Sequence, residues 1–189
     1  LAREAGLALG RKGSIAVNER METSAKDVYA VGDAVEIWHT VTGQKTLLSL
    51  AGPANKQGRI AADNICGGSS VYRGAQGSFV LKLFDLTAAA TGINEQTARE
   101  AGIGCDKIYL SPSSHAGYYP GGQAMTIKVV FETGTFRLLG AQIVGREGVD
   151  KRIDVLAAAI RAGMTGPELS ELDLAYAPPY SSAKDPVNM

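Results

Sequence analysis

Two neighbouring segments with a two-residue alternation constrain the fold of this chain more than any other feature. Residues 123–131 and 136–144 place apolar and polar side chains in turn, and Thr133-Gly134-Thr135 lies between them. A period of two is that of a β-strand with one buried face, and a short glycine-containing connection is typical of a hairpin. The pattern predicts an antiparallel hairpin whose buried face carries Ile127 and Val129.

Further strands and helices are predicted around this hairpin. Strands are expected at residues 78–84, 88–92 and 107–110, and helices at 95–102, at 149–162 and after Pro167. Asn94 is placed to cap the first of these helices, and Gly163 is placed to end the second. Together these segments predict an α+β unit, in which helices pack against a mostly antiparallel sheet.

The N-terminal part of the chain contains too few strands to close a parallel sheet, so it is predicted to be only a piece of an α/β domain. Val28–Val31 is a compact β-prone run that is expected to form a buried parallel strand. A helix is predicted over about residues 46–66. A start near Pro53 is the alternative, because proline is unfavourable inside a helix.

A domain boundary is predicted after this helix. Its apolar face runs from Leu50 to Ile65 at helical spacing. A connector that contains glycine and serine follows at residues 67–76. The chain is accordingly divided into residues 1–72 and residues 73–189.

Charge and composition exclude several classes of function. Lys and Arg number 19 and so do Asp and Glu, so no overall basic field attracts nucleic acid or anionic lipid. No apolar run approaches the roughly 20 residues that a membrane span needs. Cys66 and Cys105 lie far apart and form no C-x-x-C pair, which gives no metal-ligand pattern and favours a reducing, cytoplasmic compartment. Leu1–Gly6 is predicted to lie inside a helix, and with no initial Met the chain is expected to be a fragment.

Gly32 and Asp33 end the strand predicted at Val28–Val31. A carboxylate in this position lies at the carboxyl end of a parallel sheet, where α/β folds bind ligands. Gly32 lets the backbone approach a ligand closely, and Asp33 can accept hydrogen bonds from a polyol. The alternative is an ordinary turn that contains Asp, and the dipeptide alone favours that alternative.

The longer segment Thr23-Ser-x-x-Asp-Val-Tyr-Ala-Val-Gly-Asp33 resembles the second flavin motif of the pyridine nucleotide-disulfide reductase family. The resemblance implies that Gly32 and Asp33 bind FAD, with Asp33 on its ribitol. Leu50 and Ala51, at the start of the next helix, are similar to the family segment that approaches the flavin ring, where a helix N-terminus favours an anionic flavin. The implied domains are the last piece of an FAD-binding domain and a C-terminal dimerisation domain.

The sequence of residues 51–65, within the predicted helix, resembles that of the subgroup that contains coenzyme A disulfide reductases and NADH oxidases or peroxidases. Asn55 and Arg59 lie on one helical face, and a basic face that carries an amide is suited to a phosphorylated substrate. The alternative is a solvated surface on which Arg59 pairs with Asp63, and composition alone favours it. The resemblance implies that Asn55 contacts coenzyme A.

The tail Tyr176–Met189 resembles the terminal segment of coenzyme A disulfide and persulfide reductases. The resemblance implies that Tyr176 reaches across a homodimer into the partner's active site and that Lys184 contacts coenzyme A. A second tyrosine of that site is expected in the loop before the hairpin, where Tyr118 is the better match and Tyr119 the other. Without the resemblance, these tyrosines are expected to pack in the core with satisfied hydroxyls.

The resemblance spans essentially the whole chain and implies a homodimeric enzyme that uses FAD and NADH or NADPH to reduce coenzyme A disulfide, coenzyme A persulfide or polysulfide. The family's first flavin motif, nicotinamide motif and redox cysteine have no counterpart in the sequence. The chain alone is therefore expected to be inactive, and Cys66 and Cys105 are expected to be structural. The alternatives are an NADH oxidase or peroxidase of the same superfamily, and a module that acts only in dimerisation.

Overall fold

The computed structural model describes residues 1–189, which form two compact units. Unit 1 comprises Leu1–Gly77 and unit 2 comprises Ser78–Met189. Both mix helices with antiparallel strands, in agreement with the α+β class predicted from the sequence. None of the helices has the length and apolar character needed to cross a membrane.

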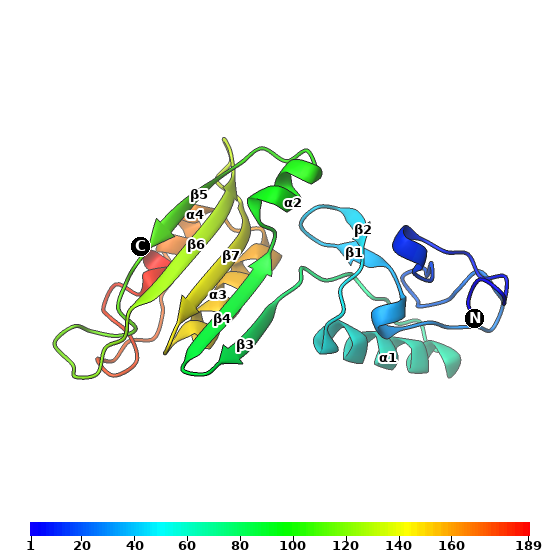
Figure 1. Cartoon of the computed structure of the whole chain (residues 1–189), viewed down its shortest axis with the longest axis horizontal. Coiled ribbons are helices and arrows are strands. Elements are labelled where there is room, and N and C mark those ends of the chain that lie inside the picture. The colour runs from blue at the N-terminus through cyan, green and yellow to red at the C-terminus, as the bar shows by residue number, and fades with distance from the viewer. The chain divides into compact units, whose positions relative to one another are not determined.

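Unit 2 is built on a five-stranded antiparallel sheet with the strand order β3-β4-β7-β6-β5 (Figure 1). The strands are β3 (Phe79–Leu83), β4 (Leu86–Gly92), β5 (Cys105–Leu110), β6 (Met125–Glu132) and β7 (Leu138–Gly145). The predicted hairpin is confirmed as β6 and β7, with Ile127 paired to Ile143. Ile127 and Val129 are buried as expected, because they lie on the face of the sheet that the helices cover.

The helices of unit 2 are α2 (Glu95–Glu100), α3 (Val149–Ala162) and α4 (Gly166–Ser170), followed by a 3-10 turn, η3 (Pro186–Asn188). α3 lies across β4 and β7 (Figure 1). Both predicted helix ends are confirmed: Asn94 Oδ1 accepts the Thr97 N–H at 2.9 Å, and Gly163 ends α3 in the left-handed region at φ 75°.

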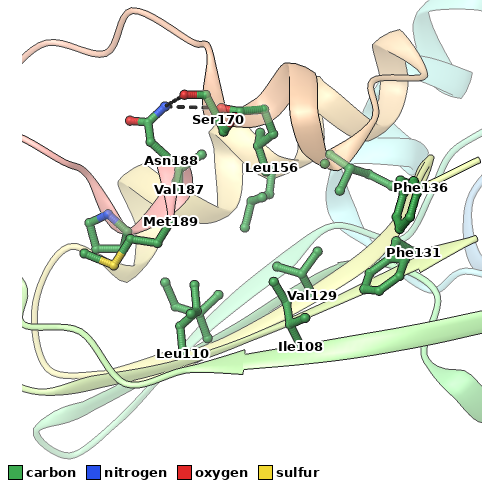
Figure 2. Close-up of a pocket in the computed structure, with 15 residues that line it drawn as sticks. Ile108, Leu110, Val129, Phe131, Phe136, Leu156, Ser170, Val187, Asn188 and Met189 are labelled. Atoms are coloured by element: carbon green, nitrogen blue, oxygen red, sulfur yellow. Dashed lines mark hydrogen bonds between the residues drawn. The ribbon is translucent and has the colours of Figure 1, made fainter.

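A cavity of about 310 Å³ lies in unit 2 between the sheet and the C-terminal residues. Apolar side chains of β5 and β6 line one wall, and Leu156, Val187 and Met189 contribute to the other (Figure 2). Asn188 Nδ2 donates to the carbonyl oxygen of Leu169 at 3.2 Å. The last residues of the chain are therefore tied to the end of α4 and close this side of the unit.

Unit 1 contains a two-stranded hairpin and one long helix. Its elements are η1 (Arg11–Gly13), η2 (Gly32–Ala34), β1 (Ile37–His39), β2 (Gln44–Thr46) and α1 (Ala51–Ile65). α1 begins at Ala51, between the two predicted starts, and Pro53 lies in its first turn, where a missing N–H leaves no helical hydrogen bond unmade. The core of unit 1 includes Val35, Ile37 and Ala61.

The buried parallel strand predicted at Val28–Val31 is wrong. Only Tyr29 forms a bridge there, and it is antiparallel to Glu22. The N–H of Ala30 donates to the Met21 carbonyl at 3.1 Å, so the segment folds back on the residues just before it. No other strand of the chain runs beside it, and Val28 and Val31 remain exposed.

Two smaller expectations for unit 1 also differ from the structure. Leu1–Gly6 forms turns rather than a helix, and Gly6 has a positive φ of 72° that interrupts a helical path. On α1 the side chain of Ile65 is 63% exposed, whereas Gln57 and Asn64 are buried beside Ala61. The buried face of α1 is therefore partly polar, and its amides bind backbone groups of neighbouring loops.

Candidate functional site

In unit 1 the Gly32 turn is attached to α1 by a short hydrogen bond. The N–H of Gly32 donates to Gln57 Oε1 at 2.6 Å, and η2 packs against α1. Gly32 has a φ of 77°, a conformation that residues with a Cβ rarely adopt. The backbone at this position is therefore fixed, and it presents the next residue, Asp33, to solvent.

The first turn of α1 has no negative group to neutralise it. The N-cap residue, Leu50, offers no side-chain hydrogen bond, and no acidic residue lies in the first turn. The unpaired N–H groups of a helix start carry a partial positive charge that attracts anions. Ala51 is exposed, so this end of the helix is open to a ligand. The structure thus brings Gly32, Asp33, Leu50 and Ala51 to one helix and the turn packed on it.

Asn55 and Arg59 are both exposed on α1. The ion pair of Arg59 with Asp63, which was the alternative to ligand binding, does not form. Asp63 instead accepts a hydrogen bond from Ser70 Oγ at 2.7 Å. The guanidinium of Arg59 forms no ion pair within the chain, so its five donors are available to an external phosphate or carboxylate.

In unit 2 the structure joins Tyr118 and Tyr176, which are 58 residues apart, through a hydrogen bond between their hydroxyl groups. Tyr118 lies in the loop between β5 and β6, and Tyr176 lies in the tail after α4. Their side chains are 76% and 45% exposed, so neither is a packed core residue. The hydrogen bond shared with Tyr118 is the main cause that raises the pKa of Tyr176 above its usual value. Tyr176 presents a neutral phenol to solvent at physiological pH, as an ordinary tyrosine also does.

Tyr119 has a different environment from its neighbour. Its ring packs edge-on against His115, with centroids 5.5 Å apart and an interplanar angle of 84°. His115 is buried, and its Nδ1 lies 3.1 Å from the carbonyl oxygen of Ala116. Tyr119 therefore packs against a buried neighbour, whereas Tyr118 is the tyrosine of this loop that hydrogen-bonds to Tyr176.

Lys184 is exposed and takes part in no side-chain hydrogen bond or ion pair. It lies two residues after Ser182, whose hydroxyl donates to the Lys184 carbonyl. The structure does not bring its ammonium group to the tyrosine hydroxyls. The group is free to contact a ligand from outside the tail.

The sequence did not predict a buried polar network that the structure shows in unit 2. Arg152, on α3, is fully buried and donates to Asp185 through Nε and Nη2 at 3.2 and 3.1 Å. Ser181 Oγ also donates to Asp185. Burial alone would raise the pKa of Asp185, but the hydrogen bonds from Ser181 and Val187 and the charge of Arg152 outweigh it and lower the pKa. The network therefore contains a carboxylate paired with a guanidinium.

One signal in the sequence points to this network. Arg152 lies three residues after Val149 and four before Leu156, inside the apolar stripe of α3. A charged residue in such a stripe requires a buried partner. Asp185 could not be chosen as that partner from the sequence, because it lies 33 residues away in an irregular tail.

No group of three or more His, Cys, Asp or Glu side chains is arranged to bind a metal ion. Both cysteines are free: Cys66 is exposed and Cys105 is half-buried. The exposed candidate site features are therefore the Gly32–Asp33 turn and the helix start of unit 1, and the tyrosine pair of unit 2.

The sequence of the chain matches two models of one known protein family. The family model "Pyridine nucleotide-disulphide oxidoreductase, dimerisation domain" matches residues 79–186, which is more than half of the chain. A second model, "Pyridine nucleotide-disulphide oxidoreductase", matches residues 1–58. The chain belongs to the pyridine nucleotide-disulphide oxidoreductase family.

Three similar proteins carry the names of enzymes that act on sulfur compounds. The NAD(P)H sulfur oxidoreductase (CoA-dependent) of Pyrococcus abyssi is 40% identical over 99% of this chain and 42% of the relative. Coenzyme A disulfide reductase of Staphylococcus aureus is 36% identical over 96% of this chain and 41% of the relative. The NAD-dependent persulfide reductase of A. fulgidus has a TM-score of 0.96 at 48% identity, over 99% of this chain and 35% of its own. The chain thus spans about two-fifths of the length of the curated relatives it matches.

Proposed function

We propose that this chain acts as part of an FAD-dependent NAD(P)H reductase of coenzyme A disulfide, coenzyme A persulfide or polysulfide. The observation that carries the proposal is the hydrogen bond between the exposed hydroxyls of Tyr118 and Tyr176. Two phenols from separate segments that meet at the surface are not a core contact, and a positioned phenol can donate a proton to a bound ligand. The substrates named for the relatives support the assignment to coenzyme A and sulfur chemistry.

The residues of unit 1 fit a bound FAD. The Asp33 carboxylate is exposed and makes no ion pair, so it can accept hydrogen bonds from the ribitol hydroxyls. The uncapped start of α1, at Leu50 and Ala51, would stabilise negative charge on the flavin ring. Gly32 leaves room for close approach of the cofactor. FAD, when bound, supplies the hydride-accepting and electron-relaying chemistry of the enzyme.

The substrate contacts would come from three exposed polar side chains. Asn55 and Arg59 lie on one face of α1, where an amide and a free guanidinium can bind phosphate oxygens. Lys184 adds a second positive charge from the tail. Coenzyme A carries phosphate groups, so these donors match the charged part of the proposed substrate.

The tyrosine pair would act where the sulfur leaving group develops charge. Reduction of one disulfide by one NAD(P)H and one proton gives two thiols, and the departing thiolate must be protonated. A neutral phenol close to that sulfur can donate a hydrogen bond or the proton itself. The hydroxyl of Tyr176 is protonated at neutral pH, as that of an ordinary tyrosine is, so it is available as a donor.

The enzyme would work as a homodimer. The match of residues 79–186 to a dimerisation domain supports self-association of unit 2. We propose that Tyr118 and Tyr176 serve the active site of the partner subunit. The reactive cysteine would then belong to one subunit and the proton donors to the other.

The change Tyr176→Phe in the complete enzyme tests this function. It keeps the ring and removes the hydroxyl, so reductive turnover of the coenzyme A substrate should fall by about 10²-fold or more. Flavin reduction by the nicotinamide should change little, because that half-reaction needs no leaving-group proton. Stopped-flow measurement separates the two half-reactions.

Tyr180→Phe is the matched control for this test. Tyr180 lies in the same tail, is 72% exposed, and its hydroxyl forms no hydrogen bond within the chain. Turnover should be unaffected by its change. Unchanged turnover in a folded, dimeric Tyr176→Phe variant would remove the tyrosine pair from the chemistry and leave it a surface contact.

A further inference from the structure

We propose that Arg152 is the positioning residue that fixes the loop of Tyr118 and the tail of Tyr176 at the separation at which their hydroxyls meet. The role in geometry stands on the contacts of unit 2 alone. Its consequence for turnover rests on the proposed function.

Arg152 is bonded to three separate segments of unit 2. Its Nη2 donates to the carbonyl of Ser114, in the loop after β5, at 2.9 Å. The same nitrogen and Nε donate to Asp185 in the tail, at 3.1 and 3.2 Å. Its Nη1 donates to the carbonyl of Gly148, at the start of its own helix, at 3.0 Å. One rigid guanidinium therefore connects the loop, the tail and α3.

The connection continues to the two tyrosines through the backbone. The N–H of Ala116 donates to the carbonyl of Ser181 at 2.9 Å, which joins the loop directly to the tail. Tyr118 lies two residues beyond Ala116. The N–H of Ser181 donates to the carbonyl of Ala177 at 3.2 Å, and Ala177 follows Tyr176. Each tyrosine is thus one or two residues from a backbone group that the network fixes.

The Arg152 network is suited to holding the loop and the tail in a fixed orientation. Breaking a buried ion pair is costly, yet an apolar replacement of both partners is often neutral or stabilising, so stability alone gives little reason to bury one. The planar guanidinium has five donors in fixed directions, and four hydrogen bonds to Ser114, Asp185 and Gly148 use them here. A Cβ at Gly148 would collide with Nη1, so the glycine preserves the space that this orientation needs.

The test reads the tyrosine pair directly by NMR, in the full chain labelled with ¹³C at tyrosine Cζ. Signals are assigned with Tyr118→Phe and Tyr176→Phe, and each phenol is titrated with pH. Arg152→Lys keeps the positive charge but removes the planar guanidinium and its fixed set of donors. The double change Arg152→Met with Asp185→Leu removes both charges together, so it leaves no unpaired buried charge if the single variant is unstable. Arg161→Lys, at an exposed position of the same helix, is the control.

In the unaltered protein, replacing either tyrosine by Phe should shift the signal of the other. In folded Arg152→Lys and in the double variant this coupling should be lost, and the pKa of Tyr176 should fall toward the ordinary value of about 10. Arg161→Lys should leave both signals unchanged. Tyrosine titrations that stay coupled in both folded variants at Arg152 would overturn the proposal, whatever happens to turnover.

Turnover of the complete enzyme separates this proposal from the proposed function. If both are correct, Arg152→Lys lowers turnover by about 10²-fold, and adding Tyr176→Phe costs little more, because the two changes remove one shared interaction. Loss of the tyrosine coupling with full turnover would leave the positioning role standing and remove the phenols from catalysis. Coupling that survives with reduced turnover would overturn the positioning role alone.

Discussion

At the scale of single residues, one acidic side chain connects three elements of unit 2. Glu95, on α2, accepts a hydrogen bond from Lys128 on β6 and forms an ion pair with Lys107 on β5 at 3.4 Å. The Lys128 ammonium also lies 5.7 Å from the ring centre of Tyr109. The hydrogen bond from Lys128 is the largest cause that lowers the pKa of Glu95 to about 2. The carboxylate therefore stays charged in the folded protein over a range in which it would be protonated in the unfolded chain.

Glu95→Gln should change how the stability of the protein depends on pH. Because the folded pKa is below the unfolded value of 4.5, the stabilisation is fully present above pH 4.5 and is lost as the pH falls toward about 2. The stability difference between the unaltered protein and Glu95→Gln should therefore be largest above pH 5 and shrink between pH 4.5 and 2. Thermal unfolding across this range measures it. Glu147→Gln, at an exposed position without an ion pair, is the control and should show no such trend. A stability difference for Glu95→Gln that does not change with pH would contradict the lowered pKa of Glu95.

The buried polar residues mark where prediction from the sequence stops. Asp33 and Gly32 could be singled out because a local motif contains them. Gln57 and Arg152 could not be given a role, because each binds a backbone group that is 25 or more residues away. Helical periodicity distinguishes apolar from polar positions, but it carries no information on which distant carbonyl or amide a side chain will meet.

At the scale of elements, β4 and β7 approach each other closely where β4 ends. Gly92 has a φ of 70°, and Gly140 on β7 lies opposite it. A Cβ on Gly140 would overlap the carbonyl oxygen of Ile93 and lie 2.7 Å from its nitrogen. These are backbone atoms, so no side-chain rotation can relieve the overlap. The hydrogen bond from the Ile93 N–H to the Leu139 carbonyl, at 2.9 Å, depends on this approach.

Gly140→Ala should therefore destabilise unit 2 by at least the roughly 1–3 kcal/mol that overpacking usually costs. Urea unfolding followed by circular dichroism measures the change. Gly117→Ala is the control, since a Cβ there would meet no atom within 4 Å and the residue has no positive φ. Equal stability of Gly140→Ala and Gly117→Ala would show that the β4–β7 contact is looser than described.

Elements were predicted best where their own neighbours in sequence stabilise them. α3 was predicted with both ends correct, because its apolar stripe and its terminal glycine are local signals. The β6–β7 hairpin was predicted for the same reason. The segment Val28–Val31 has the composition of a buried strand, but composition does not supply the neighbouring strand with which it must pair. Its interpretation as a parallel strand failed for that reason.

At the scale of the whole molecule, exposed apolar side chains lie along the β3 edge of the sheet in unit 2. The strands β3 and β4 and their connection carry a set of exposed apolar side chains: Phe79, Val80, Leu81, Leu83, Phe84 and Leu86. Phe84, at the turn between the strands, is 97% exposed. Several large apolar side chains exposed on neighbouring strands are typical of an interaction site. Such a surface agrees with the match of unit 2 to a dimerisation domain.

We therefore expect the chain to associate into dimers of twice its 19.7 kDa mass. A twofold, isologous contact that is obligate should bury more than roughly 2,000 Å² in total, which is enough for a stable dimer at micromolar concentration. Because folding is then coupled to association, the midpoint of thermal unfolding should rise with protein concentration. Sedimentation velocity at a few to tens of micromolar measures the mass, and scans at the same concentrations measure the midpoint. A monomer at tens of micromolar, with a midpoint independent of concentration, would contradict dimerisation through this chain.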